Sequence, residues 1–250
     1  MKGRTVLIAG ASSGIGEGFA RVLAKAGARV VLGARRLNHC EAIAGEIVDA
    51  GGEACAVSLD VTDEASVIAA YDAAEARFGT VNAIVCNAGI GTGGRSTDVS
   101  VEGLRSVLDT NLLGSYLVAR EGAKRMIAAG SREREDGRIV LIGSITAEQN
   151  GTGDAMYAAS KAGLAHLGRQ FAREWVRQGI NVNVLQPGWI PTEINAEWFA
   201  SDRGKADVER LHRRRLLNTD SLDDMLLYLL SERSRQVTGS VFTIDDGQSL

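Results

Sequence analysis

The hydrophobic residues of the chain fall into two alternating patterns. Short, near-continuous runs of apolar and β-branched residues are followed by longer stretches in which apolar residues recur with helical spacing. Such apolar runs predict strands buried on both faces, and the stretches between them predict the helices that cover those faces. The expected strands span residues 5–9, 29–33, 53–59, 83–86, 138–142, 180–185 and 241–244. The expected helices span about residues 14–26, 39–50, 63–78, 101–129 and 156–177.

The repeated strand–helix units predict the topology. Parallel strands need crossover connections, and these are right-handed in nearly all known cases. We therefore expect an α/β fold, a Rossmann-like, doubly wound and mostly parallel sheet of seven strands flanked by helices. No linker or internal repeat interrupts the pattern, so residues 1–250 are expected to form a single domain. Two charged stretches stand apart: 131–136 is expected to be a solvated loop, and 212–215 an exposed helix face.

Composition narrows the class of protein. Of the 250 residues, 45% are hydrophobic, and 28 Lys and Arg against 31 Asp and Glu give a formal net charge of -3. This balance gives no electrostatic reason to expect nucleic acid or an anionic membrane as a partner. The N-terminal apolar run is too short for a signal peptide, and no later run reaches membrane-spanning length, so we expect a cytoplasmic location. The cysteines and histidines show no ligand spacing, so we expect no disulfide framework and no metal site.

A glycine-rich turn follows the first expected strand. Gly10 allows the chain to turn sharply, while Gly14 and Gly16 leave room for a pyrophosphate and for close packing of helix on sheet. The next helix presents free N–H groups and the positive end of its dipole to an anion. A strand, a glycine turn and a helix in this order predict a dinucleotide site.

The second strand indicates which dinucleotide is bound. NAD sites place an acidic residue about 20 residues beyond the turn, where it binds the ribose hydroxyl groups. Here the strand ends in Gly33-Ala34-Arg35-Arg36, with no carboxylate at that place. Guanidinium groups attract a 2′-phosphate and bond it bidentately. Arg35 and Arg36 therefore predict NADP(H) as the cofactor, the alternative being that both are ordinary surface charges.

Further motifs follow in a fixed order along the chain. After the Gly10/Gly14/Gly16 turn come Asp60-Val61, Asn87-Ala88-Gly89, Asn111, Ser144, Tyr157-x-x-x-Lys161 and Pro187-Gly188. With these motifs the chain resembles the classical short-chain dehydrogenase/reductase family over nearly its whole length. It departs at Ala9, where the family usually has Thr, and at Cys86, which takes the first place of an Asn-Asn-Ala-Gly run. Neither departure removes a reacting group.

The residue types of the predicted catalytic group explain its chemistry. Tyr157 and Lys161 are four residues apart on an expected helix, so they share one face. An ammonium near a phenol favours the phenolate, so we expect the pKa of Tyr157 to fall from about 10 toward the working pH. Tyr157 then serves as general acid for carbonyl reduction and as base for alcohol oxidation. Ser144 can hydrogen-bond the substrate oxygen and stabilise the charge that develops there.

The resemblance implies roles for the other motif residues. Lys161 would also hold the nicotinamide ribose, and Asn111 would position a water that links Lys161 to solvent as a proton relay, although Asn111 alone could be a simple mid-helix polar contact. Asp60 and Val61 would contact adenine. The remaining cofactor contacts that it implies are Ser12, Ser13, Ile15, Asn87, Ala88, Gly89, Pro187, Gly188, Ile190 and Thr192.

Substrate specificity is expected in the loops that follow the strands, chiefly in a lid over about residues 189–217. Trp189, Trp198 and Phe199 fall in this lid, which predicts an apolar pocket for a bulky or aromatic ketone or secondary alcohol. The alternative is that these rings only pack the lid onto the core. Small residues on the helices 101–129 and 156–177 permit close packing, and the family uses these helices as a subunit interface, so we expect a homotetramer.

The sequence therefore predicts an NADP(H)-dependent oxidoreductase that interconverts a ketone or aldehyde and an alcohol. One alternative is a reductase of carrier-bound 3-oxoacyl thioesters, for which the basic run 212–215 is the candidate carrier contact. Another is a non-catalytic NADP(H) sensor. The intact Ser144, Tyr157, Lys161 and Asn111 argue against the sensor.

Overall fold

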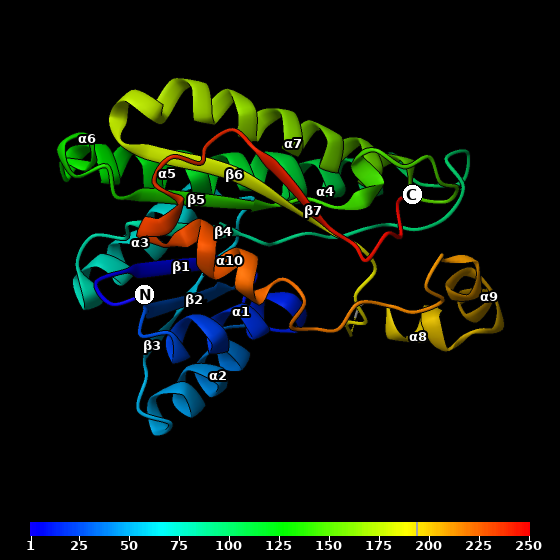
Figure 1. Cartoon of the computed structure of the whole chain (residues 1–250), viewed down its shortest axis with the longest axis horizontal. Coiled ribbons are helices and arrows are strands. Elements are labelled where there is room, and N and C mark those ends of the chain that lie inside the picture. Colours follow the sequence, from blue (N-terminus) through cyan, green and yellow to red (C-terminus); the bar gives the residue numbers. More distant parts are fainter. Residues whose placement is uncertain (194) are drawn as a thin grey trace.

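The computed structural model describes residues 1–193 and 195–250, and over these residues seven strands form one sheet (Figure 1). The strand order is β3-β2-β1-β4-β5-β6-β7, and every neighbouring pair is parallel. The expected Rossmann-like, doubly wound fold is confirmed, with a fully parallel sheet. The strands are β1 Thr5–Ala9, β2 Arg29–Ala34, β3 Glu53–Ser58, β4 Ala83–Cys86, β5 Gly137–Ile142, β6 Ile180–Pro187 and β7 Val241–Ile244.

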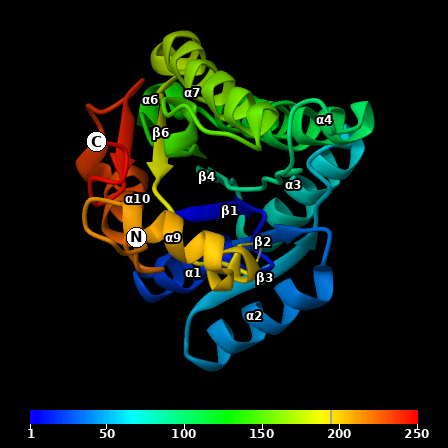
Figure 2. The same ribbon diagram turned by 90° about the vertical axis from the view of Figure 1, so that its right-hand side faces the viewer.

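Helices cover both faces of the sheet, as Figure 2 shows edge-on. Along β1, Leu7 and Ala9 join the core under α3, α5 and α7, whereas Val6 and Ile8 join the core under α1, α2 and α10. This alternation follows from the two-residue period of a strand, and it requires apolar residues at every position. The helices are α1 Gly14–Lys25, α2 Leu37–Asp49, α3 Glu64–Phe78, α4 Val101–Leu108, α5 Ser115–Ala128, α6 Ser131–Arg134, α7 Ala155–Trp175, α8 Ala196–Ala200, α9 Asp202–Arg210 and α10 Asp223–Leu230.

The helix predicted over 101–129 is interrupted. Between α4 and α5 the backbone forms a π-helix, Asp109–Gly114, which contains Asn111. A side chain at Gly114 would place its Cβ 2.6 Å from Val61 Cγ2, so α5 approaches the end of β3 closely at this point. Single π-turns within helices are frequent at functional sites, because they displace one residue from the regular helical register.

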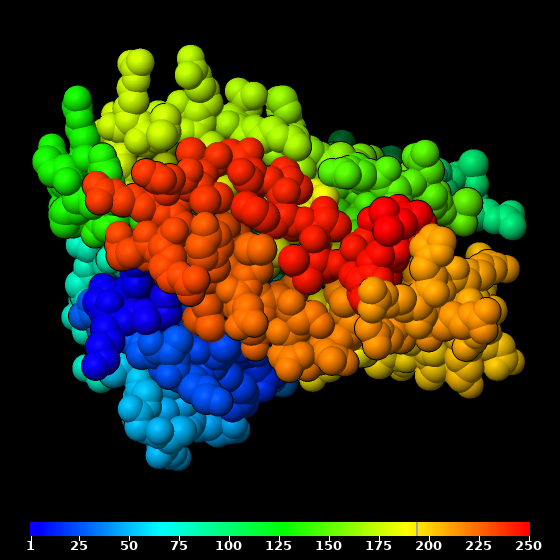
Figure 3. Space-filling view, viewed as in Figure 1, coloured from blue at the N-terminus to red at the C-terminus, as the bar shows by residue number. Residues whose placement is uncertain are grey.

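The predictions for the two charged stretches were right about exposure, since residues 132–135 and 212–215 are exposed, but wrong about secondary structure. Part of 131–136 is helical, as α6, and Ser131 is fully buried with its hydroxyl donating to the Gln178 carbonyl at 2.7 Å. The run 212–215 follows the end of α9 and forms a turn instead of a helix face. Arg213 and Arg215 pair with Asp246 of the C-terminal tail, which Figure 3 shows beside this turn.

The predicted lid, 189–217, contains the short helices α8 and α9 and projects beyond the sheet (Figure 1). Ile194 falls within this range and lies outside the described residues. The lid follows β6, at the edge of the sheet formed by the carboxyl ends of the strands. In open α/β sheets ligands bind at this edge, where the strand order reverses, here between β1 and β4.

Candidate active site

A cavity of about 740 Å³ lies at the carboxyl ends of the strands. It brings together residues that the chain scatters over nearly 190 positions. Three predicted site residues, Gly16, Asn111 and Trp198, are not among the described residues that line it. The predicted residues that do line it are Gly10, Ser12, Ser13, Gly14, Ile15, Arg35, Arg36, Asp60, Val61, Asn87, Ala88, Gly89, Ser144, Tyr157, Lys161, Pro187, Gly188, Trp189, Ile190 and Thr192.

The glycine turn is packed so closely that side chains would not fit. Gly10 has φ +82°, and a Cβ there would lie 2.7 Å from Ala88 Cα. A Cβ at Gly16 would lie 2.1 Å from the Gly10 carbonyl oxygen, which also accepts a hydrogen bond from Asn87 Nδ2 at 2.8 Å. Gly16 therefore allows α1 to pack on the turn, while Gly10 and Gly14 border the cavity itself.

The end of the cavity near β2 is basic. Arg36 Nε donates to Ser12 Oγ at 3.1 Å, and Arg36 Nη2 donates to Ser13 Oγ at 2.6 Å. These bonds join the glycine turn to the residue that follows β2. Arg35 lies close enough to Asp60 to help lower the pKa of that carboxyl, although hydrogen bonds from Thr62 contribute most. Two guanidinium groups, two hydroxyl groups and the N-terminus of α1 form a donor set that fits the phosphates of NADP(H).

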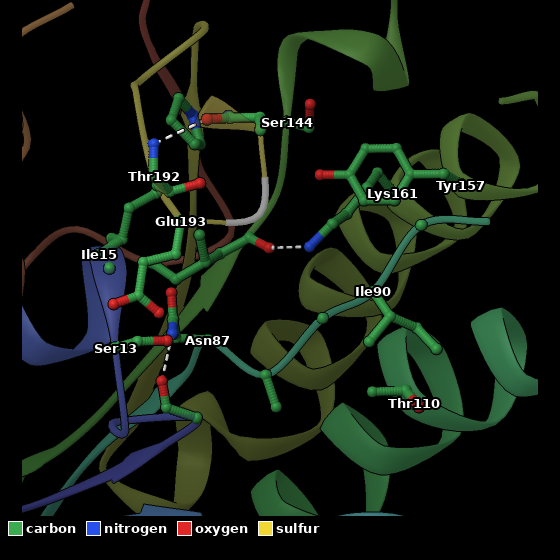
Figure 4. A pocket seen from close by; sticks show the side chains of 18 of the residues that line it. Ser13, Ile15, Asn87, Ile90, Thr110, Ser144, Tyr157, Lys161, Thr192 and Glu193 are labelled. Atoms are coloured by element: carbon green, nitrogen blue, oxygen red, sulfur yellow. Dashed lines mark hydrogen bonds between the residues drawn. The ribbon is translucent and has the colours of Figure 1, made fainter. Parts of the chain in front are cut away.

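Ser144 and Tyr157 lie at the opposite end of the cavity (Figure 4). The backbone N–H and the hydroxyl of Thr146 both donate to Ser144 Oγ, at 3.2 and 2.9 Å. These bonds occupy the acceptor positions of the Ser144 oxygen and leave its own proton free to point elsewhere. The nearby Ser144 hydroxyl acts to lower the pKa of the Tyr157 phenol. A hydroxyl pair at one point of a cavity can bond the two lone pairs of a carbonyl oxygen.

Lys161 lies behind the tyrosine ring, one turn along α7. Its side chain is 4% exposed, and Nζ donates to the Ile142 carbonyl at 2.8 Å. Nζ lies 5.5 Å from the centre of the Tyr157 ring. Burial lowers the pKa of Lys161 to about 8, because the charged form loses its hydration.

The expected fall in the pKa of Tyr157 is not found. Burial raises the pKa of Tyr157 above its ordinary value, the nearby Ser144 hydroxyl opposes this shift, and the nearby Asp154 charge adds to it. The predicted pKa of Tyr157 included only the effect of the Lys161 ammonium. Burial of the phenol and the carboxylate three residues before it in the chain act in the opposite direction.

Asn111 is fully buried, and its side chain is fully engaged. Its Oδ1 accepts from the Ile90 N–H at 2.8 Å, and its Nδ2 donates to the Ile90 carbonyl at 2.9 Å and to Ser160 Oγ at 3.0 Å. The side chain thus fixes the segment after β4 against α7. A Cβ at Gly89 would lie 3.4 Å from Asn111 Oδ1 and 3.5 Å from Lys161 Nζ, so Gly89 keeps the space between them open. The role of Asn111 in a proton relay stays a prediction.

The lid contributes one aromatic ring to the cavity wall. Trp189 lines the cavity and packs against Phe199 of α8, with ring centres 5.7 Å apart. Trp198 is 42% exposed, and the Arg203 guanidinium lies 5.4 Å from its ring centre. The two tryptophans are therefore in different environments, and Trp189 is the one placed to meet a substrate.

Sequence reasoning missed several lining residues near Tyr157. Asp154 lies three residues before Tyr157, about one helical turn away, and this spacing was a usable signal. The others come from the π-helix, from a short 3-10 turn after β5 and from loops, whose positions no periodic pattern reveals. These missed residues include Ile90, Gly91, Thr110, Gly143, Thr146 and Asp154.

Comparison with known proteins agrees with this geometry. Residues 10–249 match the sequence model of the family described as enoyl-(acyl carrier protein) reductase. The oxidoreductase UcpA of Salmonella typhimurium is 35% identical over 259 residues, covering 100% of this chain and 96% of that protein. The chain belongs to the short-chain dehydrogenase/reductase family. This membership confirms the resemblance inferred from the ordered motifs.

Solved structures of the family superpose closely on this chain. A gluconate 5-dehydrogenase of Burkholderia cenocepacia in complex with NADP and tartrate has a TM-score of 0.93 at 32% identity, covering 100% of this chain and 96% of its own. A 3-ketoacyl-(acyl-carrier-protein) reductase of Brucella melitensis complexed with NADH has a TM-score of 0.90 at 32% identity, covering 100% and 99%. One of these two structures thus contains NADP and the other NADH.

Two absences hold for residues 1–193 and 195–250. No helix in these ranges is long and apolar enough to cross a membrane. The same residues contain no group of three or more His, Cys, Asp or Glu side chains that could hold a metal ion.

Proposed function

We propose that this short-chain dehydrogenase/reductase is an NADP(H)-dependent enzyme that interconverts a ketone or aldehyde and an alcohol. The observation that carries the proposal is the arrangement of one cavity. Ser144, Tyr157 and Lys161 lie at one end of it, and Arg35 and Arg36 lie at the other. An extended dinucleotide can then place its nicotinamide at the hydroxyl groups and its 2′-phosphate at the guanidinium groups.

The bound cofactor supplies the hydride, which adds two electrons and one hydrogen to the carbonyl carbon. Tyr157 donates its phenolic proton to the carbonyl oxygen as the carbon–oxygen π bond breaks. Ser144 donates a hydrogen bond to the same oxygen and stabilises its developing charge. Lys161, as an ammonium against the Tyr157 ring, stabilises the phenolate left behind. In the direction of alcohol oxidation the phenolate takes the proton back.

The preference for NADP(H) follows from the end of β2. Arg36 is held by Ser12 and Ser13, so its guanidinium is oriented before any ligand binds. Preorganised donors favour binding because less side-chain freedom is lost. With no acidic residue at the end of β2, NAD(H) gains no compensating contact to its ribose hydroxyl groups.

A reductase of carrier-bound acyl groups is the second candidate. The proposed carrier contact, the basic run 212–215, is partly neutralised within the chain. Arg213 and Arg215 pair with Asp246, at 3.2 and 2.8 Å, and His212 Nε2 lies 2.7 Å from a Leu250 oxygen. These contacts favour a small, freely diffusing substrate. Trp189 in the cavity wall supports the proposal of a bulky or aromatic substrate.

We also propose that the enzyme is a homotetramer and that it is located in the cytoplasm. An apolar groove of about 430 Å³ runs between the π-helix, α5 and α7. Leu113 and Tyr116 border it and are 46% and 38% exposed. Exposed apolar surface of this kind is typical of protein interfaces. Light scattering after size-exclusion chromatography tests whether the mass in solution is four times that of one chain.

NADPH consumption against a panel of ketones and aldehydes tests the activity. We expect turnover of at least one aryl ketone with NADPH, and slower turnover with NADH. A panel without any turnover, in the presence of tight NADPH binding, would favour the non-catalytic sensor.

A further inference from the structure

Asp154 places a carboxylate beside the predicted catalytic tyrosine. It is the residue directly before α7, and it lines the same cavity as Ser144 and Tyr157. Its charge is close enough to Tyr157 to contribute to the raised pKa of the phenol. Asp154, Ser144 and Tyr157 therefore border the same space, in which a substrate bound at the two hydroxyl groups would lie.

Asp154 is half-buried, and hydrogen bonds within the described residues satisfy its carboxylate only in part. Its Oδ1 is buried and makes no hydrogen bond within the described residues. No lysine, arginine or histidine in the described parts of the chain forms an ion pair with it. Backbone N–H groups of Thr92, Gly93 and Tyr157 favour the charged carboxylate, although burial has the larger effect and raises its pKa.

The surrounding backbone makes room for this side chain. A Cβ at Gly91 would lie 2.7 Å from Asp154 Oδ2, so a larger residue there would displace the carboxylate. Gly91 also lines the cavity. A buried acceptor without a donor is costly, and such groups in active sites are frequently completed by a ligand.

We propose that Asp154 selects substrates that carry a hydrogen-bond donor on the carbon next to the reacting carbon. The donor is a hydroxyl or an ammonium group, so the substrate class is α-hydroxy and α-amino ketones with the matching vicinal diols and amino alcohols. The carboxylate repels substrates with an acidic group at the same place. This inference rests on the proposed function, because it names the substrate class of the same site.

A structural role for Asp154 makes a different prediction. If the carboxylate only joined the segment after β4 to α7, its loss would lower turnover of every ketone by the same factor. A specificity role changes the ratio between two ketones that differ only in the donor. The ratio therefore separates the two roles.

The test compares four aryl ketones of similar size. Acetophenone has no donor, 2-hydroxy-1-phenylethanone has a hydroxyl on the α-carbon, 2-amino-1-phenylethanone has an ammonium there, and benzoylformate has a carboxylate. We expect kcat/KM with NADPH to be about tenfold or more higher for a donor-bearing ketone than for acetophenone, the gain typical of a hydrogen bond to a charged group. The faster of the two donor-bearing ketones identifies the donor. Benzoylformate is expected to be the poorest substrate.

Two variants complete the test. Asp154→Asn and Asp154→Leu should reduce the ratio of donor-bearing ketone to acetophenone to near one, and Asp154→Asn should improve benzoylformate relative to acetophenone. The exposed Asp98→Asn, in the loop after β4, is the charge-matched control and should keep the wild-type ratios. A wild-type ratio near one, or a ratio that both Asp154 variants preserve, would overturn the inference.

A binding measurement keeps this inference separate from the proposed function. Calorimetry with NADP⁺ present compares 1-phenyl-1,2-ethanediol with 1-phenylethanol. Tighter binding of the diol, lost in Asp154→Asn, supports the assignment even if no ketone is reduced, whereas equal binding overturns it. Absence of turnover for all four ketones counts against the proposed function alone.

Discussion

Lys161 contacts the face of the Tyr157 ring, with Nζ 5.5 Å from the ring centre, while its hydrogen bond goes to the Ile142 carbonyl. The hydrogen bond of the ammonium is thus made to the backbone, and the ammonium faces the tyrosine ring without bonding the phenol oxygen. Burial lowers the pKa of the lysine to about 8 and raises that of the tyrosine, so at neutral pH the lysine is still mostly an ammonium while the phenol is neutral. A neutral phenol is the form required to donate a proton to a carbonyl oxygen.

The buried Lys161 makes stability depend on pH. Its pKa is about 8 in the folded chain and 10.5 as a free side chain, so between these values the folded chain binds fewer protons than the unfolded chain. Stability due to this group therefore rises as pH increases through that window. Lys161→Met removes the effect. We expect the free energy of unfolding of the variant, relative to wild type, to fall by about 3 kcal/mol from pH 8 to 10.5.

Urea denaturation of both proteins without cofactor, at several pH values, measures this difference. A constant offset between the two proteins would reflect the lost Ile142 bond and altered packing. Only the change with pH of the difference in unfolding free energy reports on the Lys161 charge. A difference that is the same at every pH would contradict the lowered pKa of Lys161.

Arg36 should decide between the two nicotinamide dinucleotides. Arg36→Ala removes a guanidinium that Ser12 and Ser13 hold in place, and we expect the KM for NADPH to rise about 10- to 100-fold, the value of charged hydrogen bonds to a phosphate. The KM for NADH should change little, since NADH has no 2′-phosphate. Arg35→Ala should shift the ratio in the same direction. Steady-state kinetics with both cofactors measure the ratio of the KM for NADPH to the KM for NADH. If neither variant changed this ratio, the two arginines would be ordinary surface charges.

Gly16 and Gly18 form a matched pair within α1. A Cβ at Gly16 would lie 2.1 Å from the Gly10 carbonyl oxygen, whereas a Cβ at Gly18 meets nothing within 4 Å. Gly16→Ala should destabilise the protein by about 2 kcal/mol or more and weaken NADPH binding. Gly18→Ala should stabilise it by up to about 1 kcal/mol, because alanine is the better helix former. Thermal unfolding of both variants compares them directly, and equal melting temperatures would be inconsistent with the packing described here.

The Gln248 side chain forms hydrogen bonds with residues near both ends of the lid. Its Oε1 accepts from the Trp189 N–H at 2.6 Å, and its Nε2 donates to the Arg215 carbonyl at 3.3 Å. Gln248→Met keeps the size of the side chain and removes both bonds. We expect a higher KM for the ketone with kcat largely retained, and faster proteolysis within the lid. The neighbouring Ser249→Ala serves as control, and a variant whose KM and proteolysis match wild type would show that the lid is held by other contacts.

The sequence predicted best those features that depend on residue type and on neighbouring positions in the chain. The strands β1 and β4 match their predicted bounds, because uninterrupted apolar runs between turn residues leave little choice of register. The resemblance to the family, which rests on the order of the motifs, grouped Ser144, Tyr157 and Lys161 as one catalytic set. In the folded chain all three residues line the same cavity.

Features that depend on contacts distant in sequence could not be predicted. The π-helix around Asn111 involves the close approach of Gly114 to Val61, and the turn at 212–215 involves Asp246. The pKa of Tyr157 is governed by burial and by Asp154, and burial is a property of the folded chain. Trp198 was placed in the site by its type and proximity to Trp189, but the short helix α8 leaves it exposed.

Tyr157→Phe provides the most direct test of the proposed activity. The substitution removes one hydroxyl and keeps the buried ring against Lys161. NADPH turnover with the best aryl ketone is measured alongside NADPH binding by fluorescence. The account predicts a loss of kcat of at least 100-fold, the lower range for a general acid, with NADPH binding retained. Near-wild-type turnover in a variant that still binds NADPH would contradict it.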